Sequence, residues 1–183
     1  MTIAVVVILA IMILTIVAAY NYLVKLKNRV DNIFSSVEVL LEKRYDLLPS
    51  LFDVVQGFMA HERALFKEVS SLRTLAIKTH EADTKLHLDA KLVSPLNGIL
   101  IAVENYPQLK SSENVLKLQA ALSEIEEQIS AARRAYNQSV TDHNNALEMI
   151  PTNILAALMK YKKRALYEAS ELSGKTEAAE LIG

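Results

Sequence analysis

The hydrophobic positions of the chain begin with an unbroken run from Ile3 to Val24. The run, IAVVVILAIMILTIVAAYNYLV, contains 22 residues and has no charge, no proline and no glycine. At about 1.5 Å per residue, a helix of this length matches a hydrocarbon layer of about 30 Å. The pattern therefore predicts a membrane-spanning helix over residues 3–24.

The alternative for this segment is a cleaved secretory signal, and three features argue against it. A signal peptide has a basic start, an apolar core of about 7–15 residues and a cleavage site flanked by small residues. Met1 and Thr2 carry no charged side chain, the apolar run is too long, and the helical pattern continues past Ala18 and Ala19 without a break. We therefore expect a retained anchor over residues 1–24.

The residues that follow the anchor indicate its orientation. Tyr20 and Tyr22 fit the aromatic belt of a membrane interface, and Lys25, Lys27 and Arg29 come just after them, whereas no Lys or Arg precedes the span. Basic residues are enriched on the cytoplasmic side of membrane helices. The asymmetry predicts that the part after the anchor is cytoplasmic.

After the anchor, apolar residues recur three and four positions apart, the spacing of one helical face and of coiled coils. The first such stripe consists of Leu23, Leu26, Val30, Ile33, Val37, Leu40 and Leu47. Arg44 takes an apolar slot of this stripe, and the anchor helix is expected to continue to about Asp46. Pro49 lacks a backbone donor and crowds the preceding turn, so we expect a break or kink there.

A second stripe predicts a helix from Leu51 to about Thr79. Its apolar members are Leu51, Val54, Val55, Phe58, Leu65, Val69, Leu72 and Ala76. Gly57 interrupts it at a cost of about 1 kcal/mol in helix propensity, and close packing against a neighbouring helix would explain its presence.

The segment from His80 to Val93 has a weak pattern, and the choice between helix and loop stays open. Ser94 and Pro95 are typical of a cap followed by proline at the first helical position. The short apolar face after them ends before Tyr106 and Pro107.

The strongest pattern predicts one long amphipathic helix from Glu113 to Met149. Its apolar face consists of Val115, Leu118, Leu122, Ile125, Ile129, Ala132, Tyr136 and Val140. Pro151 is expected to stop or kink this helix. A shorter final helix is then indicated by Ile154, Leu155, Leu158, Tyr161 and Leu166.

These segments predict an all-α protein. Four glycines and four prolines in 183 residues leave little material for the turns of a β-rich fold. Long amphipathic helices joined by short connections cannot bury their stripes alone, which favours an antiparallel helical bundle. We expect the anchor at 1–24, the bundle at 25–170 and a frayed tail at 171–183.

Composition narrows the classes of function. The formal net charge of −1 offers no basic surplus for a nucleic-acid interface. The absence of cysteine excludes disulfides, thiolate catalysis and cysteine-ligated metals. The sequence also has no glycine-rich phosphate loop, no Gly-x-Ser-x-Gly and no Glu-x-x-His pair of the kind that di-iron bundles use twice. We therefore expect a protein that is not an enzyme and has no cofactor.

The histidines give no complete metal site. His61 and Glu62 resemble the start of a zinc-protease motif, but the second histidine is replaced by Leu65. His80 and His87 lack an evident third ligand and are interpreted as surface residues. His143, beside Asn144, is interpreted as a polar residue of a bundle layer, with a ligand role as the alternative.

Several polar residues fall near expected core positions. They are Arg44, Asp46, Gln119, Arg133, Asn137 and Asn144. A charge inside a bundle is costly unless it is paired. We predict that Arg44 or Asp46 is paired across the first bend. The expected partner is Glu104, Glu126 or Arg133 of another helix. We interpret these polar residues as pairs that set helix register, with a binding site as the alternative.

Taken together, several sequence blocks resemble the LemA family. They are YNYLVKLKNRV, LLEKRYDLLPSL, GFMAHE, ENYPQLKSSENVLKLQAALSEIEEQI, ARRAYNQSVTDHNNAL and IPTNILAAL. Pro49, His61, Glu62, Tyr106 and Pro107 lie in these blocks and are structural or interaction candidates. The chain departs from the family pattern at Ser50, where asparagine is usual, and at Pro95.

The resemblance implies a bacterial membrane-anchored protein with an antiparallel four-helix bundle and no agreed enzymatic activity. Some relatives are associated with magnetosome membranes, which hints at membrane organisation. The leading hypothesis is a scaffold that contacts the bilayer through residues 3–24 and binds a protein partner or another copy of itself. The alternatives are a small-molecule or metal site in the bundle, using His61 or His143, and a membrane-remodelling protein.

Overall fold

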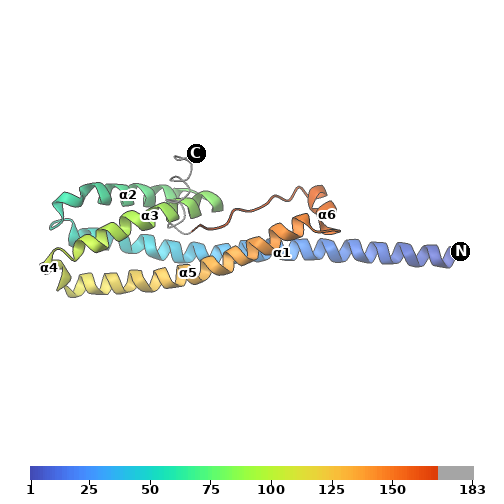
Figure 1. Ribbon diagram of the computed structural model, residues 1–183, viewed down its shortest axis with the longest axis horizontal. Coiled ribbons are helices and arrows are strands. Elements are labelled where there is room, and N and C mark those ends of the chain that lie inside the picture. Colours follow the sequence, from blue (N-terminus) through green and yellow to red (C-terminus); the bar gives the residue numbers. More distant parts are fainter. Residues whose placement is uncertain (169–183) are drawn as a thin grey trace, which may run out of the picture. The chain divides into compact units, whose positions relative to one another are not determined.

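The computed structural model describes residues 1–168, and these residues form helices and connecting segments without a strand (Figure 1). The helices are α1 Thr2–Val55, the 3-10 helix η1 Ala60–Glu62, α2 Arg63–Lys78, α3 Ala82–Val103, α4 Pro107–Lys110, α5 Glu113–Glu148 and α6 Thr152–Leu158. The all-α prediction is confirmed. The predicted frayed tail at 171–183 lies outside the described residues.

The chain folds as two compact units. Unit 1 consists of Met1–Ser35 and Arg134–Leu166, and unit 2 consists of Ser36–Arg133 together with the segment that begins at Tyr167. The long helices α1 and α5 each contribute one part to either unit. Helix α6 belongs to unit 1, whereas α2, α3 and α4 belong to unit 2. The anchor boundary at 24/25 stays a prediction.

Helix α1 continues through Pro49, so of the expected break or kink at this proline the break is wrong, and the kink stays a prediction. Proline has no N–H, and the carbonyl of Tyr45, four residues earlier, therefore lacks its helical donor. The Nε of Arg73, on α2, donates to this carbonyl at 2.7 Å. A side chain thus supplies the hydrogen bond that Pro49 removes, and the helix ends only at Val55.

The end of α1 also corrects the second predicted helix, which begins at Arg63 and not at Leu51. The turn between α1 and η1 contains Gly57, and a Cβ built there would meet no atom within 4 Å. The packing explanation for Gly57 is therefore wrong. The close approach occurs at Gly98, where a Cβ would lie 3.2 Å from Leu65 Cδ1, between α3 and α2.

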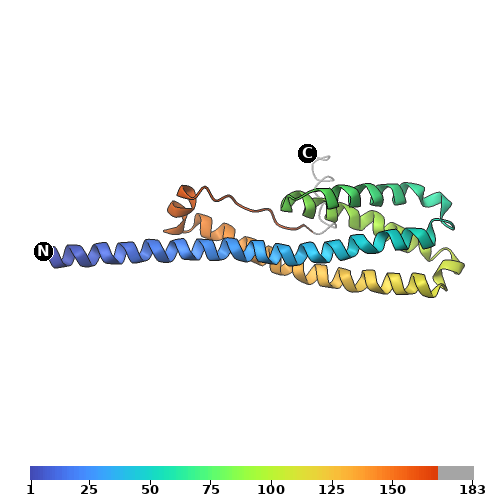
Figure 2. The same cartoon turned by 180° about the vertical axis from the view of Figure 1, so that it is seen from behind.

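The core of unit 2 is formed by apolar faces of α1, α2, α3 and α5. Helices α2 and α3 lie side by side in both views (Figures 1 and 2). The buried apolar residues of α1 in this unit are Val37, Leu41, Leu48, Leu51 and Val55. Leu41 and Leu48 replace the predicted Leu40 and Leu47, so the stripe is shifted by one residue after Val37. Each such side chain contributes about 1.5–3 kcal/mol on burial.

Helix α3 resolves the open segment from His80 to Val93. It begins at Ala82 and runs to Val103, with Pro95 inside it. Ser94 and Pro95 therefore do not start a helix, contrary to expectation. Both α1 and α3 are long and apolar enough to cross a membrane. The apolar side of α3 is buried in the core of unit 2, at residues that include Leu92 and Ile99.

Unit 1 begins with an exposed apolar helix. All residues from 1 to 18 are exposed, and Ala19 is the first buried residue. Leu23 and Leu26 then form a small core with Ala146 of α5 and Ala156 of α6. Within unit 1, the side chains of α1 thus become buried only from the end of the predicted span onward.

The long helix was predicted almost to the residue, since α5 runs from Glu113 to Glu148. The final helix is shorter than expected and ends at Leu158. Tyr161 and Leu166 follow in a segment without regular secondary structure.

Candidate functional site

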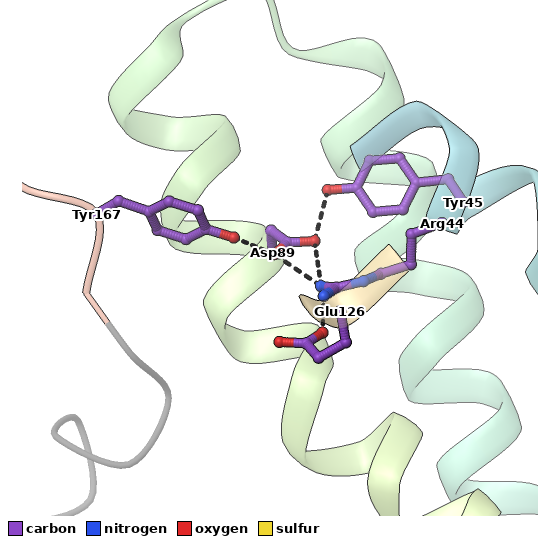
Figure 3. Close-up of polar contacts among 5 residues, drawn as sticks. All are labelled: Arg44, Tyr45, Asp89, Glu126 and Tyr167. Carbon is purple, nitrogen blue, oxygen red and sulfur yellow. Dashed lines mark hydrogen bonds and ion pairs between the residues drawn. The ribbon is translucent and has the colours of Figure 1, made fainter. Parts of the chain in front are cut away.

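A buried polar cluster lies inside unit 2, and we call it the Arg44 network (Figure 3). Its members are Arg44 and Tyr45 of α1, Asp89 of α3, Glu126 of α5, and Tyr167. One nitrogen of Arg44 donates to both carboxylate oxygens of Asp89, at 3.0 and 2.9 Å, and the other pairs with Glu126. Both tyrosine hydroxyls donate to Asp89, that of Tyr45 at 3.1 Å.

The network is placed by two helical faces that carry charges where apolar residues are expected. Arg44 continues the buried stripe of α1, and Asp89 continues that of α3. A second ion pair joins the same helices, between Glu38 of α1 and Lys85 of α3. Because the chain order within the two pairs matches, α1 and α3 run in the same direction in unit 2.

The burial of the network affects the protonation of its tyrosines. The side chains of Arg44 and Asp89 are 1% and 0% exposed, whereas that of Glu126 is 45% exposed. Burial, followed by the nearby charge of Asp89, raises the pKa of Tyr45 and of Tyr167. Both phenols therefore stay protonated and act as donors at neutral pH.

Both carboxylate oxygens of Asp89 already accept hydrogen bonds. Each of its oxygens accepts from Arg44 and from one tyrosine hydroxyl, so neither oxygen is left open for a proton, a metal or a substrate. The arrangement joins α1 and the segment of Tyr167 to one carboxylate of α3. It resembles a structural clamp more than an acid-base site.

A pocket of about 260 Å³ adjoins the network in unit 2. Its lining is Arg44, Leu96, Asn97, Leu100, Gln119, Leu122, Ser123, Glu126 and Glu127. The uncharged polar residues of this lining are Asn97, Gln119 and Ser123, and Glu126 is shared with the network. The lining thus combines apolar side chains with a few polar ones.

Unit 1 contains a different polar site, around His143 and Asn144. The side-chain amide of Asn144 donates to the backbone carbonyl of Arg164 and accepts from its N–H, both at 2.9 Å. His143 is buried, its ring lies 6.2 Å from that of Tyr161, and burial lowers its pKa. These contacts hold the segment after α6 against α5. They favour the polar-layer interpretation of His143.

A second pocket, of about 370 Å³, lies in unit 1 beside the end of the predicted span. Its lining is Tyr22, Lys25, Leu26, Arg29, Asp142, Asn145 and Met149. Arg29 donates to Asp142 across it at 3.3 Å. Two basic side chains against one acid leave this lining positively charged.

The structure brings some of the predicted site residues together. The predicted pairing of Arg44 with Glu126 is present. Tyr106, ahead of α4, donates its hydroxyl to Glu62 at 3.2 Å. The guanidinium of Arg133 lies 5.5 Å from the centre of the Tyr167 ring, a cation–π contact within unit 2.

Other candidates stand apart from any site. Asp46, Glu104, His61 and Pro107 are exposed, and Asn137 is half-buried on α5. Among residues 1–168, no three histidine or acidic side chains converge in a way that could hold a metal ion. The metal hypothesis therefore has no ligand set in the described part of the chain.

Sequence reasoning missed the centre of the network. Asp89 lies in the segment left open between helix and loop, although Leu86, Asp89, Leu92, Leu96 and Ile99 follow the three-four spacing of a buried face. The signal that could have identified Asp89 is a negative charge within an apolar face, opposite in sign to Arg44. Tyr45 carried no comparable signal, and Tyr167 lies beyond the last helix.

Comparisons with known proteins identify the family of this chain. The model of the LemA family matches residues 33–180. Protein LemA of Metamycoplasma hominis is 24% identical over 153 residues, which cover 83% of this chain and 70% of that protein.

Two magnetosome proteins are also similar. Magnetosome protein MamQ 2 of Paramagnetospirillum magneticum is 23% identical, over 88% of this chain and 69% of its own. MamQ of Magnetospirillum gryphiswaldense is 21% identical, over 81% of this chain and 64% of its own. With a family match that extends over most of its length, this chain belongs to the LemA family.

Proposed function

We propose that this LemA-family protein is a non-enzymatic scaffold, anchored in the bacterial membrane by residues 3–24. The bundle that follows is an antiparallel four-helix bundle on the cytoplasmic side, and its outer faces bind a protein partner or a second copy. One observation carries the proposal: the apolar residues 3–18 of α1 are all exposed and lead without a break into a packed helical unit.

The exposed residues would be unfavourable in water. Burying one such side chain is worth about 1.5–3 kcal/mol, and a bilayer supplies that burial along the whole segment. Tyr20 and Tyr22 then lie at the interface, and Lys25, Lys27 and Arg29 follow on the cytoplasmic side. A helix that packs into unit 1 from Ala19 onward would hold the folded part close to the membrane.

Two observations favour a scaffold over an enzyme. The most buried ionisable cluster, the Arg44 network, has its central carboxylate saturated by hydrogen bonds. Relatives named as magnetosome proteins support a role in an assembly.

The first test is membrane topology. Because the sequence has no cysteine, one introduced cysteine is the single thiol that a reagent can label. Thr2→Cys and Gln56→Cys each create a single thiol at an exposed position, one before the span and one in the turn after α1. A membrane-impermeant thiol reagent applied to intact cells should label the first and spare the second until the membrane is opened. Equal labelling of both in intact cells would contradict a span, and the reverse pattern would contradict the orientation.

The scaffold role has its own test. Cross-linking in cells should capture the protein in a defined complex, and mass measurement of the detergent-solubilised species should show the same complex. A protein that remains monomeric and cross-links to nothing would contradict the scaffold.

A small-molecule site is the second candidate, and the 260 Å³ pocket of unit 2 is the observation that favours it. Ser123→Trp would fill this pocket from α5 without removing a network residue. If the pocket binds a ligand that the cell needs, the variant should fold normally and fail to replace the wild-type protein. Full replacement would exclude this candidate.

A further inference from the structure

The connection from α5 into α6 exposes a group of large apolar side chains in unit 1. Met149, Ile150, Ile154 and Leu158 are 60%, 83%, 69% and 79% exposed. Ile154 and Leu158 lie four residues apart and thus share one face of α6. The opposite side of the helix is packed, with Ala156 buried. We call the four exposed residues the α6 stripe.

The α6 stripe lies near the end of the predicted span. Ala156 packs with Leu23 and Leu26, so α6 lies beside the residues at which the predicted span ends (Figures 1 and 2). Met149 lines the same pocket as Tyr22 and Lys25. The stripe therefore lies at the level where α1 would leave the hydrocarbon layer.

We propose that the α6 stripe inserts into the lipid interface and forms a second membrane contact beside the span. This inference rests on the proposed function, because it requires that residues 3–24 cross the bilayer. Short apolar helix faces at an interface bury themselves about 5–10 Å into the boundary between headgroups and acyl chains. A helix packed against Leu23 and Leu26 lies within that depth.

The charges around the stripe favour a lipid surface. Lys25 and Arg29 face the pocket that Met149 lines, and Lys160 and Lys162 are exposed directly after α6. Basic groups near an apolar face match the phosphates of anionic lipids.

The size of the stripe argues against a protein partner. A stable protein interface uses about 20–30 residues on each side, whereas the stripe offers four. Four apolar side chains are enough for insertion into lipid, because the span already holds the stripe at the membrane. No large contact area is then needed for binding.

The test measures depth in the bilayer with single cysteines. Ile154→Cys in the full chain, carrying an environment-sensitive fluorophore, is reconstituted in vesicles of phosphatidylcholine and phosphatidylglycerol that contain nitroxide-labelled lipid. Leu116→Cys on α5 in unit 2, 50% exposed, is the matched apolar control, and Ile11→Cys reports on the span. All three positions are exposed, so the substitutions should leave the fold intact, which circular dichroism checks.

Each outcome has one meaning. We expect nitroxides near the headgroup to quench the Ile154 label about twofold or more beyond the Leu116 label, and deep nitroxides to quench the Ile11 label. Quenching at Ile11 with Ile154 no different from Leu116 would overturn the inference and leave the anchor in place. Energy transfer between Ile154 labels without lipid quenching would overturn it in favour of a second copy. An unquenched Ile11 label would overturn the anchor and the inference together.

Discussion

The two units differ in how deeply their most buried ion pairs lie. In unit 2, Arg44 and Asp89 are almost completely buried. In unit 1, Arg29 and Asp142 pair at 53% and 31% exposure, and Asp31 pairs with both Lys27 and Arg164 at 40% exposure. Removing one partner of a buried pair leaves an uncompensated charge, whereas water replaces the partner of an exposed charge. Burial, and not the number of pairs, should decide which unit depends on its charges.

The largest effect is expected from Arg44→Ala. The change leaves the buried Asp89 carboxylate without its cationic partner and with only two tyrosine donors, which should cost about 3–5 kcal/mol. In a protein of this size that corresponds to roughly 6–20 °C in melting temperature, measured by circular dichroism in detergent. Lys117→Ala, which removes an exposed pair with Glu113, is the control and should change little. Equal melting temperatures for both variants would contradict the importance of burial.

A smaller effect is expected when only a hydroxyl is removed from the network. Tyr167→Phe keeps the ring over which Arg133 lies and deletes one donor to Asp89. A hydrogen bond to a charged group is worth about 1.5–3 kcal/mol. Tyr45→Phe should behave similarly, and the double variant should deviate from additivity because both hydroxyls serve one carboxylate. Strict additivity in thermal unfolding would show that Asp89 does not couple them.

The role of Arg73 can be separated from its charge by a double-mutant cycle with Pro49. Arg73→Ala leaves the Tyr45 carbonyl without a donor, and we expect a loss of about 1–2 kcal/mol. In the Pro49→Ala background, the new backbone N–H supplies that donor within the helix. The same Arg73 substitution should then cost measurably less. Equal costs in both backgrounds would contradict the replacement of the helical hydrogen bond by Arg73.

The limits of sequence reasoning follow from these examples. The three-four spacing was enough to predict α5 and the continuity of α1, because each apolar face repeats over many turns. It was not enough at Pro49, where the deciding donor comes from Arg73, 24 residues along the chain. Local patterns do not contain a partner that only tertiary packing supplies.

The residues of the candidate site could likewise be predicted only in part. Arg44 could be selected because it stands out in an apolar stripe, and Glu126 could be named as one of its expected partners. Asp89 was missed because its helix was weakly patterned, with Pro95 suggesting a later start. Tyr167 has no periodic neighbour after α6, so its place on Asp89 could only come from the structure.

Unit 1 should show its own dependence on pH through His143. Burial lowers the pKa of this imidazole, although Asn144 and Asp31 oppose that shift, while Arg164 and Lys27 add to it. Below the unfolded value of about 6.5, the unfolded chain therefore binds more protons than the folded one, and the free energy of unfolding decreases as pH falls.

His143→Gln should flatten this decrease, as measured by melting temperature between about pH 7.5 and 5. Asp31, whose pKa is lowered by Lys27 and Arg164 against the opposing effect of burial, loses its contribution only below its ordinary value of 3.8. The two contributions therefore fall in separate ranges of pH. A variant as sensitive to acid as the wild type over the upper range would contradict the assignment to His143.

The smallest effect is expected for Arg29→Ala. Its pair with Asp142 is long, at 3.3 Å, and both groups reach water. Asp142 also accepts from Gln138 at 2.8 Å, so it keeps a partner when Arg29 is removed. An exposed pair is worth about 0.2–1 kcal/mol and is screened by salt, and the melting temperature should therefore change by a few degrees at most. A loss comparable to that of Arg44→Ala would mean that exposure does not separate the two units, and the comparison between them would fail.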